Sequence, residues 1–143
     1  MCVTTQRYKV RSIFMLWGHF IGKINKIIYG CIAEDLVTED VIITEERVRH
    51  IKERHPNDYE MYCNFLKESV ESPDFIIETK KVDTALILKE FPDTKKQQLK
   101  IVLRLITVVD NPKFKNSIIT FMRINEKEWE RLLRNKQILY KRE

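Results

Sequence analysis

Residues 99–109, LKIVLRLITVV, constrain the fold more than any other stretch, because β-branched and aliphatic side chains favour an extended strand. Residues 117–124, SIITFMRI, have the same character and follow a turn, so we expect them to return beside the first strand. Two earlier runs, residues 73–78 and 82–89, are separated by a tight turn. Together the four runs predict a four-stranded antiparallel meander over residues 73–124.

Two helices are predicted before this sheet, over residues 44–71. Thr44 is a typical N-cap, and two glutamates follow it in the first turn, where the helix dipole favours carboxylates. The first helix should end near Arg54 or His55, because Pro56 disfavours helical geometry in the residue before it. Apolar residues then recur at helical spacing to about residue 71, which predicts the second helix, capped by Asn57 or Asp58. Its buried stripe comprises Tyr59, Tyr62, Cys63, Leu66 and Val70.

The two ends of the chain complete an α+β domain that spans residues 1–143. In the strand-rich N-terminal part, residues 1–43, a strand is predicted at 8–20, with a bulge or bend around His19 between two glycines. Residues 23–36 fit either another strand or a short helix, and of these we favour a strand followed by a short turn or helix. The C-terminal part, residues 125–143, is predicted to form a helix and a short strand or tail. That helix should begin after Asn125, run from 126 to about 135, and bury Trp129, Leu132 and Leu133.

Composition excludes several classes of protein and favours a cytoplasmic one. The apolar run 13–22 is too short to span a bilayer, and no signal-peptide cleavage site follows the N-terminus, so no membrane association is expected. The chain has only three glycines, which excludes a nucleotide-binding P-loop. Its three cysteines contain no CxxC pair and HIKERH is not HExxH, so neither metal nor cofactor is predicted. A net charge of +5 permits a nucleic-acid partner without requiring one.

The segment 44–56, TEERVRHIKERHP, holds the residues most suited to chemistry. On a helix, Arg47, His50 and Arg54 share one face, whereas His55 lies about 140° around the axis from His50. One interpretation is structural: His55 packs under the sheet and bonds a backbone carbonyl, while the other three form a solvated basic face. The alternative is that the end of the helix turns His55 toward the same site.

The functional interpretation is metal-free cleavage of RNA, in which the 2′-hydroxyl attacks the adjacent phosphate. Such a reaction needs a base, an acid and cations for the developing charge, and histidine and arginine supply these roles. Thr120 could donate a hydrogen bond to the phosphate. Lys100 and Arg104 project from one face of the central strand and could bind RNA. The sequence contains no acidic cluster typical of a two-metal nuclease.

Several segments, taken in order, resemble the phage-associated branch of the barnase/EndoU/colicin/RelE nuclease superfamily. They are IITEERVRHIKERHPNDY, SPDFIIE, LKIVLRLITV, NSIITF and ILYK, and the resemblance covers roughly residues 22–141. It implies a helical part followed by a four-stranded antiparallel sheet, and a metal-independent endoribonuclease with its site between the helices and the sheet face. Carried over residue by residue, His50, Arg54 and His55 match the HI…RHP element, and Thr120 matches the late strand.

The resemblance also implies weaker assignments: Lys23 and Tyr140 as phosphate-binding residues, and RNA as the substrate. Related domains occur in phage and mobile-element proteins and in toxin systems, which implies an antitoxin or immunity protein as a further partner. Two other functions stay open at this point. The chain could be a catalytically inactive RNA-binding module, which would show salt-dependent binding without product. It could also be a phage structural or interaction domain that recognises a protein through its sheet.

Overall fold

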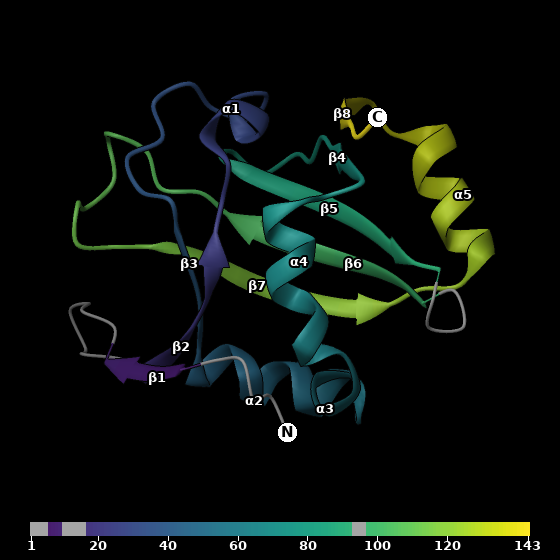
Figure 1. The fold of residues 1–143 in the computed structure, drawn as a ribbon, viewed down its shortest axis with the longest axis horizontal. Helices are drawn as coiled ribbons and strands as arrows, with labels where there is room; N and C mark the ends of the chain where they lie inside the picture. The colour runs from purple at the N-terminus through teal and green to yellow at the C-terminus, as the bar shows by residue number, and fades with distance from the viewer. Residues whose placement is uncertain (1–5, 10–16, 93–96) are drawn as a thin grey trace.

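The computed structural model describes residues 6–9, 17–92 and 97–143, and within them eight strands form one sheet, in the order β1-β2-β3-β7-β6-β5-β4-β8 (Figure 1). The strands are β1 (Gln6–Lys9), β2 (Trp17–Lys23), β3 (Asp40–Thr44), β4 (Phe75–Ile77), β5 (Thr84–Phe91), β6 (Gln97–Arg104), β7 (Asn116–Arg123) and β8 (Ile138–Lys141). The helices are α1 (Lys26–Tyr29), α2 (Glu45–Arg54), α3 (Asp58–Tyr62), the 3₁₀ turn η1 (Cys63–Phe65), α4 (Leu66–Glu71) and α5 (Glu126–Asn135). None of the described helices is long and apolar enough to cross a membrane.

The fold is mixed α+β, and its sheet is larger than the four-stranded meander we predicted. Strands β4 to β7 are neighbours, and each runs antiparallel to the next. Strands β1, β2 and β3 extend the sheet beyond β7, and β8 pairs with β4 at the other edge. The junction is a parallel pairing of β3 with β7 at only two positions, Val41 with Asn116 and Ile42 with Ser117. Local patterns do not reveal so distant a pairing.

Helix α2 begins and ends where its sequence predicts. The Thr44 side chain accepts a hydrogen bond from the backbone N–H of Arg47 at 3.2 Å, and His55 follows Arg54 as the C-cap. The second predicted helix is instead three short pieces, α3, η1 and α4. Asn57 occupies the N-cap position, one of the two that we predicted, but it has a left-handed φ of 76° and makes no side-chain cap bond. The apolar stripe that we predicted for this region is buried throughout.

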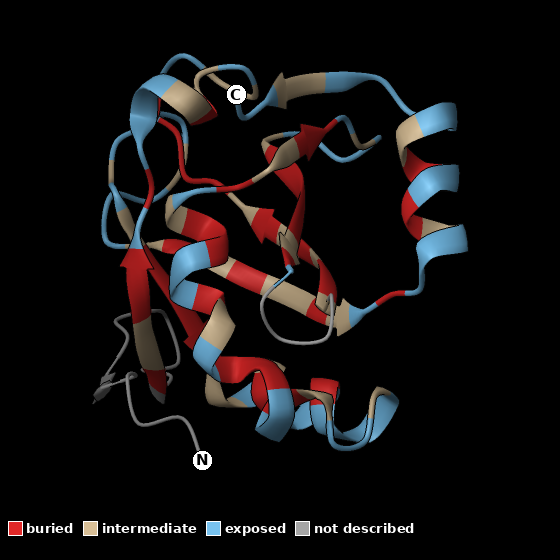
Figure 2. Cartoon of the chain, turned by 45° about the vertical axis from the view of Figure 1, so that its right-hand side comes forward, coloured by how far each residue is buried: buried red, intermediate tan, exposed pale blue. Residues whose placement is uncertain are grey.

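The two faces of the sheet carry separate cores (Figure 2). On β6, Leu99, Ile101 and Leu103 belong to the first core, which α2, α3 and α4 cover. Val102 points to the opposite face, as strand alternation requires, and packs at the edge of the second core. Helix α5 closes one end of that face and buries Trp129 and Leu132, as predicted, whereas Leu133 is only partly buried. Among the described residues no other helix covers this face, which leaves room for a site.

The N-terminal part departs from its prediction in two places. Residues 17–20 belong to β2, whereas residues 10–16 of the predicted strand 8–20 lie outside the described residues. The predicted bulge is present, because the β2–β3 register shifts between Phe20 and Gly22. The strand we favoured after Lys23 is wrong, since the chain forms α1 there instead. Asn25 caps α1 by accepting a hydrogen bond from the backbone N–H of Ile27 at 2.9 Å.

Asn116 joins three segments at the start of β7, and replacing it by alanine is expected to destabilise the fold by about 3 kcal/mol. Its fully buried side chain accepts a hydrogen bond from the backbone N–H of Ile106 and donates one to the carbonyl of Thr38, both at 2.8 Å. Alanine leaves both backbone groups unpaired. Chemical denaturation measures the loss, with Asn111→Ala as the control, because Asn111 makes a comparable side-chain bond on an exposed turn. Equal losses in the two variants would contradict the bridging role.

Candidate functional site

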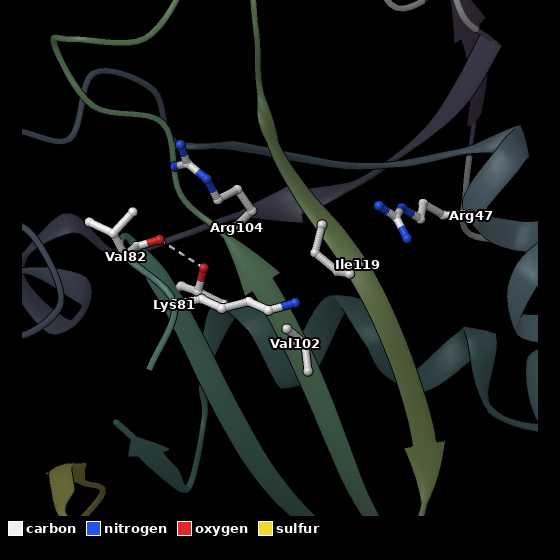
Figure 3. Close-up of a pocket in the computed structure, with 7 residues that line it drawn as sticks. Arg47, Lys81, Val82, Val102, Arg104 and Ile119 are labelled. Atoms are coloured by element: carbon white, nitrogen blue, oxygen red, sulfur yellow. Dashed lines mark hydrogen bonds between the residues drawn. The ribbon is translucent and has the colours of Figure 1, made fainter. Parts of the chain in front are cut away.

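A cavity of about 390 Å³ opens on the second face of the sheet, in the part that α5 leaves uncovered (Figure 3). Its floor is aliphatic and its rim is basic. It is lined by Arg47, Lys81, Val82, Thr84, Val102, Arg104 and Ile119. Three cations from three separate elements therefore surround one cavity, and the described lining contains no carboxylate.

Arg47 reaches the cavity because α2 lies along β7. Beyond its two pairs with β3, β7 borders α2, and the two elements pack together. Arg47 lines the cavity with Ile119, and just after α2 the Asp58 carboxylate accepts a hydrogen bond from the backbone N–H of Arg123 at 3.4 Å. Helix and strand therefore run in the same direction. On the helix, Val48 and Ile51 point into the first core, and Arg47 flanks them on the cavity side.

Strand register brings Thr120 to the same face as the cavity. Thr120 is the Cα partner of Val102, and paired residues share a face of the sheet. The register shifts at this point, so that Leu103 pairs with Ile118 and Ile119 is an extra residue that lines the cavity. Bulges of this kind turn a side chain away from strict alternation.

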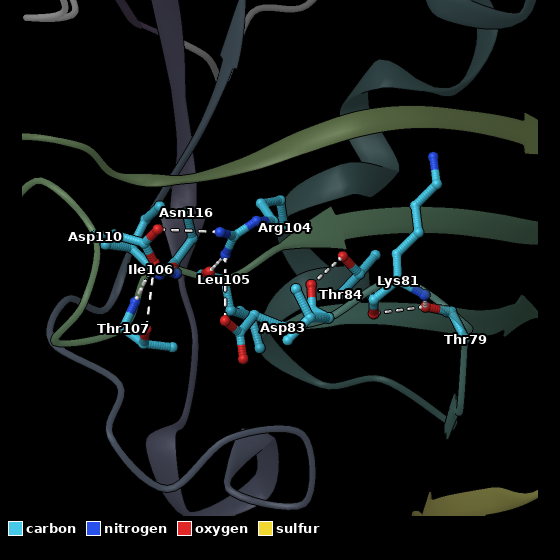
Figure 4. Close-up of polar contacts among 11 residues, drawn as sticks. Thr79, Lys81, Asp83, Thr84, Arg104, Leu105, Ile106, Thr107, Asp110 and Asn116 are labelled. Atoms are coloured by element: carbon cyan, nitrogen blue, oxygen red, sulfur yellow. Dashed lines mark hydrogen bonds and ion pairs between the residues drawn. The ribbon is translucent and has the colours of Figure 1, made fainter.

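The three cations of the rim differ in how they are paired. Arg104 contacts the Asp110 carboxylate at 3.0 Å and the Asp83 carboxylate at 3.9 Å, and it donates to the carbonyl of Leu105 (Figure 4). A backbone hydrogen bond from Thr107, together with Arg104, holds the pKa of Asp110 below its usual range. Asp110 thus remains ionised at neutral pH, and Arg104 stays paired.

Arg47 and Lys81 differ from Arg104 in how their side chains are paired. Among the residues that the structure describes, neither side chain forms an ion pair or a hydrogen bond. Lys81 is exposed, and its side chain extends over Val102 toward the Arg47 side of the cavity (Figure 3). The two cations without carboxylate partners therefore approach the same space from opposite walls.

Helical geometry places His50 next along the same side of α2. The three residues from Arg47 to His50 rise by about 4.5 Å along the helix axis. Each residue of the neighbouring strand rises by about 3.3 Å. His50 is therefore level with Thr120 or the residue after it, and Arg54 with the end of β7. Both side chains are exposed, and His50 contacts Glu46 at 4.0 Å.

His55 stands at the end of the helix and is half-buried. Its φ of −132° departs by about 70° from the helical value, so its side chain leaves the direction that an ideal helix would give it. Its backbone N–H donates to the carbonyl of Ile51 at 2.8 Å. Within the described chain the imidazole itself has no hydrogen-bond partner, so the backbone-carbonyl bond of the structural interpretation is not seen.

The remaining predicted residues lie away from the cavity. Lys23 donates to the Asp40 carboxylate at 3.0 Å, at the end of β2 opposite α2. Tyr140 pairs with Ile76 at the β8 edge and packs against the first core. Lys100 shares the face of Arg104 but lies beside α5, where it adds to the stronger effect of Arg131 in lowering the pKa of Glu128.

Sequence reasoning missed Lys81. It lies in the predicted turn after β4, where lysines are common on any soluble protein, so neither composition nor spacing distinguishes it. Only the register of β5 and β6, which pairs Thr84 with Arg104, shows that this loop borders the cavity. In the described ranges no group of three histidine, cysteine, aspartate or glutamate side chains is placed to hold a metal ion.

Comparison with protein families identifies a matching family. The model of the family described as phage-Barnase-EndoU-ColicinE5/D-RelE like nuclease 2, PBECR2, matches residues 19–141. The chain belongs to the PBECR2 family. The match begins in β2 and ends in β8, so it includes α2, strands β3 to β7 and the whole lining of the cavity, but not β1. A search of curated proteins and a search of solved structures gave no match.

Membership of PBECR2 confirms the family resemblance recognised in the sequence, and it supports nuclease activity for this chain. The position of the cavity agrees with that activity, because unpaired cations at an open sheet face suit an anionic polymer.

Proposed function

We propose that this chain is a metal-independent endoribonuclease that cleaves RNA at the cavity on the open sheet face. One observation supports this most strongly. Arg47 faces the cavity without a carboxylate partner, and the titratable side chain of His50 follows it on the same side of α2. A phosphate bound at Arg47 would therefore lie within reach of a group that can transfer protons near neutral pH.

The proposed reaction is an internal transesterification. The 2′-oxygen of the substrate bonds to phosphorus while the bond from phosphorus to the 5′-oxygen breaks, which leaves a 2′,3′-cyclic phosphate and a free 5′-hydroxyl. His50 accepts the proton of the 2′-hydroxyl, and His55 at the end of the same helix donates one to the leaving 5′-oxygen. Arg47 and Arg54 stabilise the charge on the phosphorus oxygens, and the Thr120 hydroxyl donates a hydrogen bond to one of them.

We further propose that an inhibitor protein, which the family resemblance implies, binds this chain. Such a partner would have to present acidic groups, because the cavity rim is basic. Binding there would cover Arg47 and stop access of RNA without any change in the fold.

Incubation with single-stranded RNA in the presence of EDTA tests the proposed function. Wild-type protein is expected to give products with 2′,3′-cyclic phosphate ends, and the double variant Arg54→Ala, His55→Ala is expected to give none. The same RNA with 2′-deoxy sugars should stay intact, because it lacks the nucleophile. Salt-dependent binding without product would instead identify an inactive RNA-binding module, and no binding at all would favour a structural or protein-interaction domain.

A further inference from the structure

The loop between β4 and β5 holds Lys81 in a defined place. The Thr79 hydroxyl accepts a hydrogen bond from the Lys81 backbone N–H at 3.0 Å and donates one to the Lys81 carbonyl at 3.1 Å. Two residues later Asp83 adopts a left-handed φ of 53°, and its carbonyl accepts from the backbone N–H of Leu105 at 2.8 Å (Figure 4). The loop is therefore fastened to the end of β6.

Arg104 strengthens this attachment. Its guanidinium lies between the carboxylates of Asp110 and Asp83, so its charge is balanced by two neighbours (Figure 4). In Figure 3 the group points away from the Lys81 ammonium, whereas Arg47 points toward Ile119 at the cavity. Arg104 therefore holds the loop more directly than it offers charge to a ligand.

We propose that Lys81 and Arg47 bind one phosphate group of a single RNA strand from opposite walls of the cavity, and that Arg104 positions the loop that carries Lys81. This inference rests on the proposed ribonuclease function. Val102 and Ile119 form an aliphatic floor between the two cations, which excludes water on one side and strengthens their attraction for an anion. Both cations also lack a carboxylate partner in the described chain, so no ion pair has to break.

The same lining indicates what the cavity does not recognise. No aromatic side chain is present among its described lining residues, so the cavity lacks the aromatic platform on which bases stack at other single-strand-binding surfaces. Contact with phosphate alone carries no sequence information. We therefore infer that this cavity holds the RNA backbone, with little preference for the base beside it.

The inference is tested by measuring the binding constant for a single-stranded RNA at several salt concentrations. The RNA carries 2′-O-methyl sugars, so it cannot be cleaved. Lys81→Gln is expected to weaken binding about tenfold and to reduce the slope of log K against log salt by about 0.7, the value for one phosphate contact on a single strand. The matched control is Lys80→Gln, which removes the same charge from the exposed neighbouring residue. This control should keep the wild-type slope.

The outcomes separate this inference from the proposed function. If the wild-type protein binds and cleaves RNA while Lys81→Gln and Lys80→Gln behave alike, the role of Lys81 is overturned and the ribonuclease stands. If the wild-type protein binds no RNA, both proposals fail. Arg104→Gln should weaken binding in the wild-type background but not in the Lys81→Gln background. Equal losses in the two backgrounds would show that Arg104 contacts RNA itself and overturn its positioning role.

Discussion

Replacement of Arg47 by glutamine is expected to lower the rate of RNA cleavage by about 100-fold, because removal of one group that stabilises a developing oxyanion typically has this effect. Arg47 faces the cavity without a carboxylate partner in the described chain, so its charge is available to the phosphate. Glutamine keeps the backbone N–H that the Thr44 side chain binds. The helix cap should survive, and thermal denaturation should show a midpoint close to wild type.

Arg49→Gln is the matched control for this measurement. Arg49 is exposed on the same helix, about 200° around the axis from Arg47, and it loses the same charge on replacement. If charge at the cavity determines the rate, Arg49→Gln should cleave RNA nearly as fast as wild type. Similar losses in both variants would show that only the overall positive charge of the protein matters, and would contradict the assignment of the site to this cavity.

Local chemistry was sufficient to predict the elements that surround the site. The cap at Thr44 fixed the start of α2, and the Asn125 side chain caps α5 as predicted by accepting a hydrogen bond from the backbone N–H of Glu128 at 2.8 Å. Strand alternation in β6 correctly assigned Arg104 to the face opposite Leu103. Each of these features depends on residues close together in the chain, which is why the sequence alone reveals them.

The arrangement of the site depends instead on distant contacts. Arg47 faces the cavity only because β3 leaves β7 after two residue pairs and α2 takes its place beside that strand. Lys81 belongs to the same cavity through the pairing of β5 with β6. Neither contact has a local sequence signature, so the sequence did not reveal Lys81. For the same reason Lys23 and Tyr140 were predicted to join the site, although the structure places them away from it. The contribution of each predicted residue to cleavage stays a prediction.

Replacement of His50 by glutamine is expected to reduce cleavage by between about 100-fold and 10,000-fold, the usual contribution of a positioned general acid or base. The proposed base must be neutral to accept the 2′-hydroxyl proton. Wild-type kcat/KM should therefore fall on the acid side of the pH profile, because protonation removes the base. The residual activity of His50→Gln should lose that dependence. His50 is exposed on α2, so the variant should unfold at nearly the wild-type temperature.

Two other histidines make the His50 result specific. His19 contacts the Glu45 carboxylate at 3.2 Å and pairs in β2 with Ile43 of the first core, away from the cavity, so His19→Gln should keep both the rate and the acid limb of the profile.

His55→Gln should lower the rate without lowering the unfolding temperature if His55 donates the second proton. A lower unfolding temperature with the rate of the folded protein unchanged would return His55 to a packing role. An unchanged acid limb in His50→Gln would remove His50 from the reaction, because the limb would then arise from another group.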